Sequence, residues 1–517
     1  MPPPPPVPLG PAGPRPPPPP GIAAITAPDT ADAPQQAKAP ARLPVERVHL
    51  LCPAPGGTEA AETTYTSYTP LGSGGAAQGS AELKRSVAAL TDRNAGTKKA
   101  PVSRPATDGK PVLSLAEQGR PATARTTAAT APALVGTASG RLAPGWTAQL
   151  TSVAKGDGRG LLGVNCSVPD AEFWFPGASM AKERQDYVHL TNPDDIPAVV
   201  DVELYGKAGL LRTTVTEGIP VPAGSSVPVL LSTLTTDVAE DVTVRVATRS
   251  GRVGAAVRAA ETRPTAAKAG AAFAAEGSDW LNATAGPSAA VVLPGIPADA
   301  TSVRLVAFAP GEDDADLKIQ LAGPGGKIVP AGSEGLHVKS GMTASIELKD
   351  VTRGEAGSLI LGPAQRGRAT PVVAALRVVR GKGTKQEIAF IPATAPVGAR
   401  ASIADNRAKG TTLSLTAPGA AARVRVTASS GSGGGTPVVK TYQVPAGTTK
   451  AFVPPVPAGL KGSYALTVTV ESGGPVHASR ALALPLGGVA AFTIQTLSDD
   501  RGTVAVPRVT DELTVLD

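Results

Sequence analysis

The sequence predicts an all-β protein made of tandem immunoglobulin/fibronectin-like β-sandwich units, preceded by a disordered amino terminus rich in proline and alanine. Three observations predict this fold. Many short runs alternate apolar and polar residues with a period of two, which is typical of strands with one buried face. Turn residues recur about every 8–12 positions, and the whole pattern returns after about 100 residues, which predicts six or seven short strands in each unit. Helical periodicity is nearly absent.

The composition provides enough apolar residues for hydrophobic cores, and the distribution of charge argues against nucleic-acid binding. Hydrophobic residues make up 42% of the 517 residues but aromatic residues only 3%, so valine, leucine, alanine and isoleucine must fill the cores. The net charge is +7, with lysine and arginine scattered among acids. Nucleic-acid binders concentrate cations on one face, so no nucleic-acid partner is expected. A mildly basic solvated surface explains the charge; weak attraction to an anionic cell wall or membrane is the alternative.

Residues 1–45 are predicted to be a disordered leader and stalk. Residues 1–20 are mostly proline and can form neither a signal helix nor a membrane helix. Residues 21–28 (GIAAITAP) look like the end of an apolar signal core, so we expect the natural start to differ, which would allow an amino-terminal signal or membrane anchor. The alternative is a genuine polyproline leader on a chain that is not exported.

The first sandwich unit is predicted at 46–170, with a flexible insertion near 85–135. Its first strand contains Cys52 and its last strand ends at Cys166, the two cysteines of the chain. An even cysteine number without a CxxC motif favours a disulfide over a zinc site. Such a bridge would join the two ends of one sandwich and requires an oxidising compartment. Two buried thiols are the alternative.

Three further units are predicted at 171–265, 280–385 and 400–485. Each contains a pair of alternating strands, and each ends in a closing hairpin around a glycine turn. The strand pairs occupy 187–206, 303–323 and 411–428, and the closing hairpins occupy 244–259, 360–378 and 466–484. The first unit ends in a further closing hairpin at 148–166.

Residues 486–517 are predicted to form a connector and an extra strand. The segment 503–509 (TVAVPRV) resembles the first strand of a unit that does not continue. Because a lone apolar strand promotes aggregation, we expect it to pair with a sheet edge of an earlier unit. The connectors share an aromatic residue after each closing hairpin, namely Trp174, Trp280, Phe390 and Phe492.

No catalytic or metal-binding motif is visible. His49, His189, His337 and His477 fall in different units without a spacing typical of metal or triad chemistry, and no cofactor motif occurs. Two acidic turns, at 192–195 and 311–316, are interpreted as solvated turns, with calcium binding as the alternative.

The aromatic run Phe173-Trp174-Phe175 is the most unusual local feature of this aromatic-poor chain. We interpret it as a plug between the first two units. The alternative is a surface on which sugar rings stack.

Three stretches resemble a known family: HLLCPAP (49–55), LLGVNCSVPDAEFWFPGAS (161–179) and YVHLTNPDDIPAVVDVELYG (187–206). They are similar to a family of large secreted actinobacterial proteins, known only as a domain of unknown function, and the similarity covers roughly 44–517. The resemblance implies an envelope location but no activity. Members typically begin with a signal or membrane anchor, and residues 1–20 depart from that pattern.

Together these observations favour a non-enzymatic secreted or cell-envelope protein, a scaffold of stacked sandwiches whose partners are cell-wall polymer or envelope proteins. A cell-wall glycan-binding protein that uses Trp174 and the basic surface is the first alternative. A glycan hydrolase is the second, and it would require two carboxyl groups about 5–10 Å apart in a cleft.

Overall fold

The structure is a computed structural model that describes residues 41–56, 62–72, 78–88, 109–127, 131–264, 273–365 and 369–506. These residues form 39 strands and three short 3-10 turns, η1 (Gly156–Gly158), η2 (Leu231–Thr233) and η3 (Gly383–Lys385), and no α-helix. The prediction of an all-β fold is confirmed. Residues 1–40 of the predicted leader and residues 89–108 of the predicted insertion lie outside the described part.

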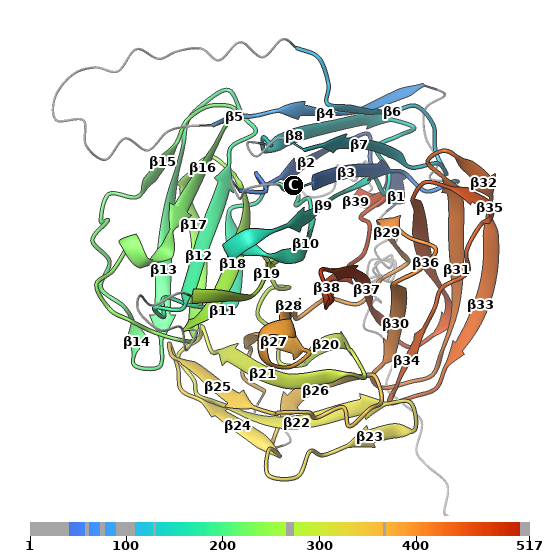
Figure 1. Ribbon diagram of the computed structural model, residues 1–517. Helices are drawn as coiled ribbons and strands as arrows, with labels where there is room; N and C mark the ends of the chain where they lie inside the picture. The colour runs from blue at the N-terminus through green and yellow to red at the C-terminus, as the bar shows by residue number, and fades with distance from the viewer. Residues whose placement is uncertain are drawn as a thin grey trace, which may run out of the picture. The chain divides into compact units, whose positions relative to one another are not determined.

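One arrangement of eight strands occurs four times (Figure 1). In chain order, the first, sixth, third and fourth strands form one sheet, and the eighth, seventh, second and fifth form the sheet that faces it. Each pair of sheets encloses a hydrophobic core, so each set is a β-sandwich. In an immunoglobulin constant domain the first, second, fourth and fifth strands share a sheet instead. The repeated unit therefore has the sandwich architecture with a strand order of its own.

The first two sandwiches cover residues 47–281. The first contains β2 (Arg47–Cys52), β3 (Glu62–Tyr68), β4 (Gly79–Arg85), β6 (Leu113–Leu115), β7 (Ala122–Thr126), β8 (Leu134–Gly140), β9 (Thr147–Ala154) and β10 (Gly160–Asn165). In the second, β14 and β15 both occupy the place of the fourth strand, and its strands are β11 (Glu172–Ala178), β12 (Arg184–Thr191), β13 (Ala198–Gly206), β14 (Gly209–Leu210), β15 (Ile219–Val221), β16 (Ser225–Leu230), β17 (Val242–Ser250), β18 (Gly254–Pro264) and β19 (Phe273–Leu281). The short β5 (Val87–Ala88) pairs in parallel with β16.

The other two sandwiches cover residues 291–497. In the third, β23 and β24 both occupy the place of the fourth strand. Its strands are β20 (Val291–Ile296), β21 (Ala300–Phe308), β22 (Ala315–Gly323), β23 (Gly326–Ile328), β24 (Gly335–Val338), β25 (Thr343–Glu347), β26 (Gly357–Pro363), β27 (Val373–Arg380) and β28 (Glu387–Pro392). The fourth contains β29 (Arg400–Asn406), β30 (Thr411–Ala417), β31 (Ala422–Gly431), β33 (Val438–Val444), β34 (Thr448–Phe452), β36 (Tyr464–Gly473), β37 (His477–Leu486) and β38 (Val489–Leu497), and a small separate sheet beside them pairs β32 (Gly434–Thr436) with β35 (Ala458–Lys461).

The alternation of apolar and polar residues along the strands correctly predicts which side chains face the core. Along β13, burial alternates at every position, so that Val200, Val202 and Leu204 face the core while the residues between them are partly exposed. The same alternation marks most of β22 and β31. Because side chains on a strand point to opposite faces in turn, this pattern fixes which face packs against the partner sheet.

The structure differs from the sequence analysis in strand number. Each sandwich has eight strand positions, where six or seven were expected. The eighth strands β19, β28 and β38 lie in stretches that were taken for connectors beyond the units. In the insertion near 85–135, β6 and β7 pair with β4 and β3, so the prediction of a flexible loop is wrong for that part.

The two cysteines form the predicted disulfide. Cys52 ends β2, Cys166 directly follows β10, and both side chains are buried in the core of the first sandwich. Since β2 and β10 belong to facing sheets, the bridge joins the two sheets and closes a sequence separation of 114 residues.

The last strand does not pair with an earlier sandwich. β39 (Thr503–Val506) pairs instead with β1 (Ala41–Pro44), a stretch that was predicted to be part of the stalk, so the expected pairing is wrong. Next to this pair, the Val45 N–H donates to the Gly502 carbonyl oxygen at 3.1 Å. The β1 segment thus gives the final strand a partner, as the aggregation argument requires.

Removing the disulfide should destabilise the first sandwich. We expect Cys52→Ala combined with Cys166→Ala to lower the free energy of unfolding by about 2–5 kcal/mol, because the unfolded chain loses a long-range constraint. Thermal unfolding of the double variant measures this. Wild-type protein in excess reductant is the matched control and should show a similar loss; an unchanged melting temperature in both would contradict the prediction.

Candidate functional site

The eighth strands of the four sandwiches contact one another in a closed cycle. β10 contacts β19, β19 contacts β28, β28 contacts β38, and β38 contacts β10 again, and all four lie toward the middle of Figure 1. The cycle brings the first and fourth sandwiches together: Asn165 Nδ2 donates to the Thr496 carbonyl oxygen at 3.0 Å, across 331 residues of sequence. The four sandwiches therefore do not form a row in which each contacts only its sequence neighbours. We take these inner strands (β10, β19, β28 and β38) as the candidate functional site.

Aromatic side chains on three inner strands fill the cores of the preceding sandwiches. Trp280 of β19 belongs to the core of the first sandwich, Phe390 of β28 to that of the second, and Phe492 of β38 to that of the third. All three are fully buried. Where the first sandwich meets the fourth, Leu161 of β10 packs against Leu482 and Ala491. The cores of the first three sandwiches are thus completed by a strand of a neighbour, and a separate apolar contact joins the fourth sandwich to the first.

A buried carboxyl group joins three of the inner strands. Asp279 of β19 accepts hydrogen bonds on Oδ1 from the Gly163 N–H of β10 and from Thr493 Oγ1 of β38, both at 3.0 Å. Burial raises the pKa of Asp279 well above its usual range. A Cβ at position 163 would lie 2.8 Å from Thr493, so only glycine permits this close approach of β10 and β38.

A second buried carboxyl group stands between β19 and β28. Glu387 Oε1 accepts hydrogen bonds from the N–H groups of Ser278 and Ile388, both at 3.1 Å. Burial raises the pKa of Glu387 to about 8, even though these backbone bonds and the nearby Arg159 act to lower it. Arg159, which precedes β10, donates to the Gln386 carbonyl oxygen at 2.7 Å and to that of Ala275 at 3.0 Å. One guanidinium group of the first sandwich thereby binds the second and the third.

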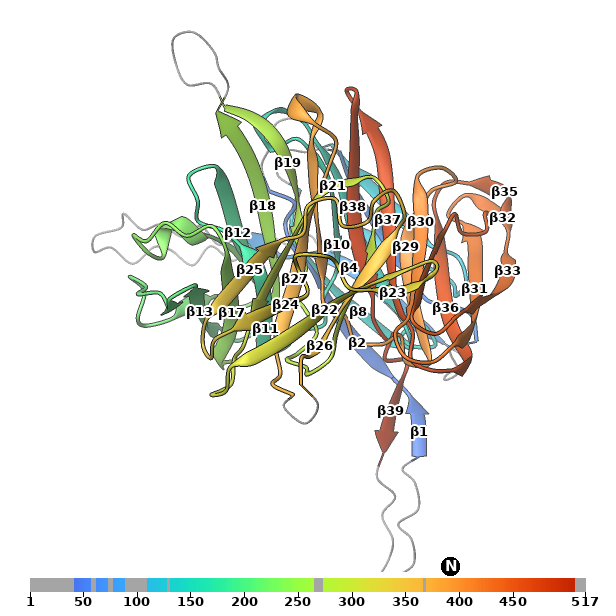
Figure 2. The same ribbon diagram turned by 90° about the horizontal axis from the view of Figure 1, so that it is seen from below.

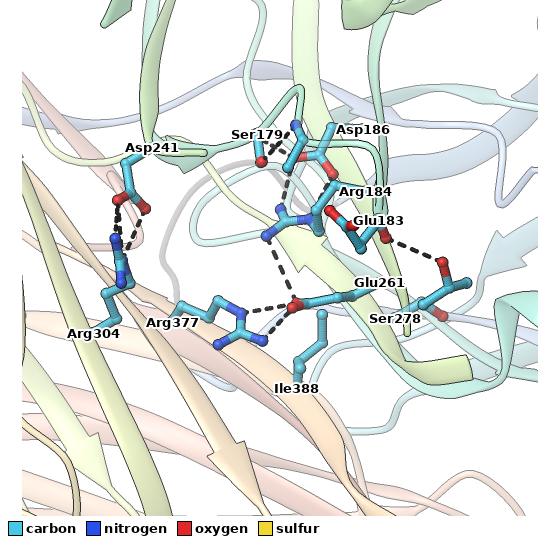
Figure 3. A network of polar contacts seen from close by, with 12 residues as sticks. Ser179, Glu183, Arg184, Asp186, Asp241, Glu261, Ser278, Arg304, Arg377 and Ile388 are labelled. Atoms are coloured by element: carbon cyan, nitrogen blue, oxygen red, sulfur yellow. Dashed lines mark hydrogen bonds and ion pairs between the residues drawn. The ribbon is translucent and has the colours of Figure 1, made fainter. Parts of the chain in front are cut away.

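Charged pairs reinforce the junction between the second and third sandwiches (Figure 3). Glu261 of β18 receives a hydrogen bond from Arg377 of β27, with 2.6 Å between Nη2 and Oε2, and Arg304 of β21 pairs with Asp241. On the second sandwich itself, Arg184 binds Asp186 at 2.7 Å, and Asp186 also accepts the Ser179 N–H. Burial raises the pKa of Asp186 despite its partner. These carboxylates are bound to arginines and hold strands together.

The predicted aromatic run is buried in β11. Phe173 and Phe175 point into the core of the second sandwich, and Trp174 points to the opposite face. There its ring packs 5.4 Å from Phe308 and 6.4 Å from Tyr205, at the junction with the third sandwich. Trp174 is only 6% exposed. It lies in a first strand, whereas Trp280, Phe390 and Phe492 lie in eighth strands, so grouping all four as equivalent connectors is wrong.

The histidines lie in different surroundings, and one of them, His337, contacts the acidic turn at 311–316. Burial lowers the pKa of His189 to about 3 and that of His477 to about 4, whereas the exposed His337 lies between Asp314 and Asp316. In the acidic turn at 192–195, Asp194 pairs with Arg252 at 2.9 Å. Over the described ranges, no group of three or more histidine, cysteine, aspartate or glutamate side chains is placed to hold a metal ion.

Positive charge is concentrated in the fourth sandwich. Residues 406–498 hold eight lysines and arginines but a single acid, Glu471, which gives this stretch a net charge of +7, the same as the whole chain. The description of cations as scattered among acids is therefore wrong for the fourth sandwich. Counting charge in windows of about one domain would have found this signal in the sequence.

Residues 122–455, running from β7 into the loop after β34, match the model of a family of unknown function (DUF5719). The chain belongs to this family. The DUF5719 match spans the second and third sandwiches completely and parts of the first and fourth. The resemblance to a domain of unknown function is thereby confirmed. Comparison with curated proteins and with solved structures gave no match. In the part of this DUF5719 protein that the structure describes, no helix is long and apolar enough to cross a membrane.

The raised pKa of Glu387 predicts a fall in stability with rising pH. Between pH 4.5, the ordinary pKa of glutamate, and about pH 8, the unfolded chain is ionised while the folded protein retains the proton, so the free energy of unfolding decreases. Glu387→Gln keeps the acceptor oxygen and cannot ionise. We expect this variant to match wild type near pH 4.5 and to exceed it by about 3–5 kcal/mol at pH 9. Denaturant unfolding at both pH values measures this. The exposed Glu312→Gln is the control, and an equal gain there would contradict the assignment.

Truncating an inner-strand aromatic should destabilise two sandwiches together. Phe492→Ala removes a fully buried ring from the core of the third sandwich while lying on a strand of the fourth. We expect a loss of about 3–5 kcal/mol and a shift of the entire calorimetric transition. Ile328→Ala, at a side chain that is 57% exposed, should change stability by less than about 0.5 kcal/mol. A separate early transition for one sandwich alone would contradict this prediction.

Proposed function

We propose that the protein is a non-enzymatic scaffold that acts outside the cytosol, in the cell envelope or beyond it. The observation that carries the proposal is the closed cycle of inner strands, in which Asp279 and Arg159 each connect three sandwiches. Such a body holds its outer surfaces at fixed relative positions. A scaffold that presents several binding surfaces to envelope components needs this property, whereas a flexible spacer does not.

The disulfide supports a location outside the cytosol. Cys52 and Cys166 are bridged, and structural disulfides persist in oxidising compartments and are rare in the cytosol. The resemblance to a family of secreted proteins agrees with this. The bridge is buried in the core of the first sandwich, as expected for a structural rather than a redox-active disulfide.

The placement of the carboxyl groups favours a structural role over glycan hydrolysis. A hydrolase needs two carboxyl groups facing substrate across a cleft. The buried Asp279 and Glu387 instead bind backbone N–H groups of neighbouring strands. A groove of about 450 Å³ on the third sandwich is lined by Glu347 and Asp350, among others, and Glu347 accepts hydrogen bonds from Ser302 Oγ and the Lys349 N–H. Glu347 thereby serves local turn and strand contacts.

The glycan-binding alternative based on Trp174 has less support. Its ring packs against those of Phe308 and Tyr205, and the Arg245 guanidinium group lies 5.2 Å from the ring centre. A sugar ring would have to displace these contacts before it could stack. The proposed scaffold therefore does not use Trp174 as a binding residue.

Fractionation of cells that produce the protein tests the proposed function. We expect the protein in the envelope or culture-medium fraction, with Cys52 and Cys166 unreactive toward a maleimide until a reductant is added. Mass spectrometry of the same material identifies the mature amino terminus and the bridge together. A cytosolic protein whose two cysteines are both alkylated without reductant would overturn the proposal.

A further inference from the structure

We propose that the outer edge of the fourth sandwich binds an anionic polysaccharide through Lys440 and Lys450. The choice of a polysaccharide rests on the proposed location outside the cytosol. The binding surface itself rests on geometry and charge.

The proposed surface lies where the two sheets of the fourth sandwich end side by side. β33 is the edge strand of the sheet β29-β36-β31-β33, and β34 is the edge strand of the facing sheet. Figure 1 shows β33 on the outside, away from the inner strands, and Figure 2 shows it beside β31. Tyr442 of β33 stacks on Phe452 of β34, with 4.1 Å between the ring centroids, and this pair closes the open edge of the core.

Two ammonium groups lie over the Tyr442 ring. Lys440 Nζ is 5.4 Å and Lys450 Nζ is 6.0 Å from the ring centroid, although the two lysines come from different sheets. Both residues are exposed, and within the described residues neither forms an ion pair. The π-system favours cations near its face and restricts where they can lie. The fold thus brings two like charges together without an acidic partner, an arrangement that an anionic ligand would neutralise.

The surroundings add further positive charge. The exposed Lys327 of the third sandwich approaches the turn between β33 and β34, since a Cβ on Gly447 would lie 3.3 Å from its side chain. On β31, next to β33, Arg423 and Arg425 share Glu471, the single acid of residues 406–498. A local excess of one sign attracts oppositely charged partners and accelerates their association.

The side chains around the lysines suit a polysaccharide better than the other polyanions. Single-stranded nucleic acids bind by stacking bases on open aromatic faces, and the Tyr442 ring is already stacked on Phe452 and lies below two lysines. Membrane insertion requires large apolar side chains, and the exposed apolar side chains at this edge are Val439 and Val453. The open backbone edge of β33 offers hydrogen bonds to sugar hydroxyls and acid groups. Exposed Thr441 and Gln443 lie on the outer face of the same strand, beside Arg425 and Arg423.

Calorimetric titration of the full-length protein with polygalacturonate, a carboxylated polysaccharide, tests the proposal. We expect binding that weakens with salt, and none to neutral dextran. The double variant K440Q/K450Q should raise the Kd about tenfold or more at 50 mM NaCl and flatten the salt dependence. K182Q/K385Q removes the same charge from exposed positions on other sandwiches and should change the Kd by less than about twofold. Melting temperatures of all variants confirm that they fold.

Three results would overturn the proposal. The first is an equal loss of affinity in both double variants, which would assign the binding to the charge of the whole molecule. The second is no binding to polygalacturonate, whether or not duplex DNA or vesicles of phosphatidylcholine and phosphatidylglycerol (3:1) bind. The third is unchanged affinity in a folded Tyr442→Ala variant, which keeps both charges but removes the ring below them. Failure of the proposed function is distinguishable, because a cytosolic location with reduced cysteines would leave this in vitro binding intact.

Discussion

The rest of the structure depends on the double role of the eighth strand. Its backbone completes a sheet of one sandwich, while its aromatic side chain completes the core of the sandwich before it, as Phe390 and Phe492 show. A sandwich cut at the boundary that the repeat suggests would lack part of its core. Because burial of large side chains supplies much of a domain's stability, we expect that the first three units cannot fold separately when they are cut at these boundaries.

The alternating strands and the disulfide were predictable from sequence, and the eighth strands were not. β13 and β22 face a core on one side and water on the other, so period two is visible in their residues. All six residues of β28 (EIAFIP) and the first five of β10 (GLLGVN) are buried, because a neighbouring sandwich covers their second face. A strand that is buried on both faces does not alternate apolar and polar residues. A polar residue in such a strand, such as Glu387, is then easily assigned to a loop.

The contacts of the candidate site side chains were equally difficult to predict from the sequence. Residues 173–175 were selected because they are aromatic. Since side chains alternate along β11, Phe173 and Phe175 lie in one core and Trp174 lies on the opposite face. No local sequence pattern shows that another sandwich covers that face. The meeting of Lys440 and Lys450 depends on two facing sheets, so spacing in sequence could not show it. The positive charge of residues 406–498 could nonetheless have been found in the sequence, by counting charged residues in each domain separately and not only in the whole chain.

The buried polar groups of the inner strands act on specificity more than on stability. Four sandwiches with one strand order could pack against one another in several orders and registers, because apolar surfaces discriminate weakly between them. Asp279 Oδ1 accepts two hydrogen bonds only where Gly163 and Thr493 both reach it, and a shift of one residue would turn these groups to the other face. Leaving such a group without its partners costs about 1–3 kcal/mol for each wrong arrangement. We infer that Asp279 selects the closed cycle among the alternatives, since an apolar residue of similar size would stabilise the wrong packings as readily as the right one.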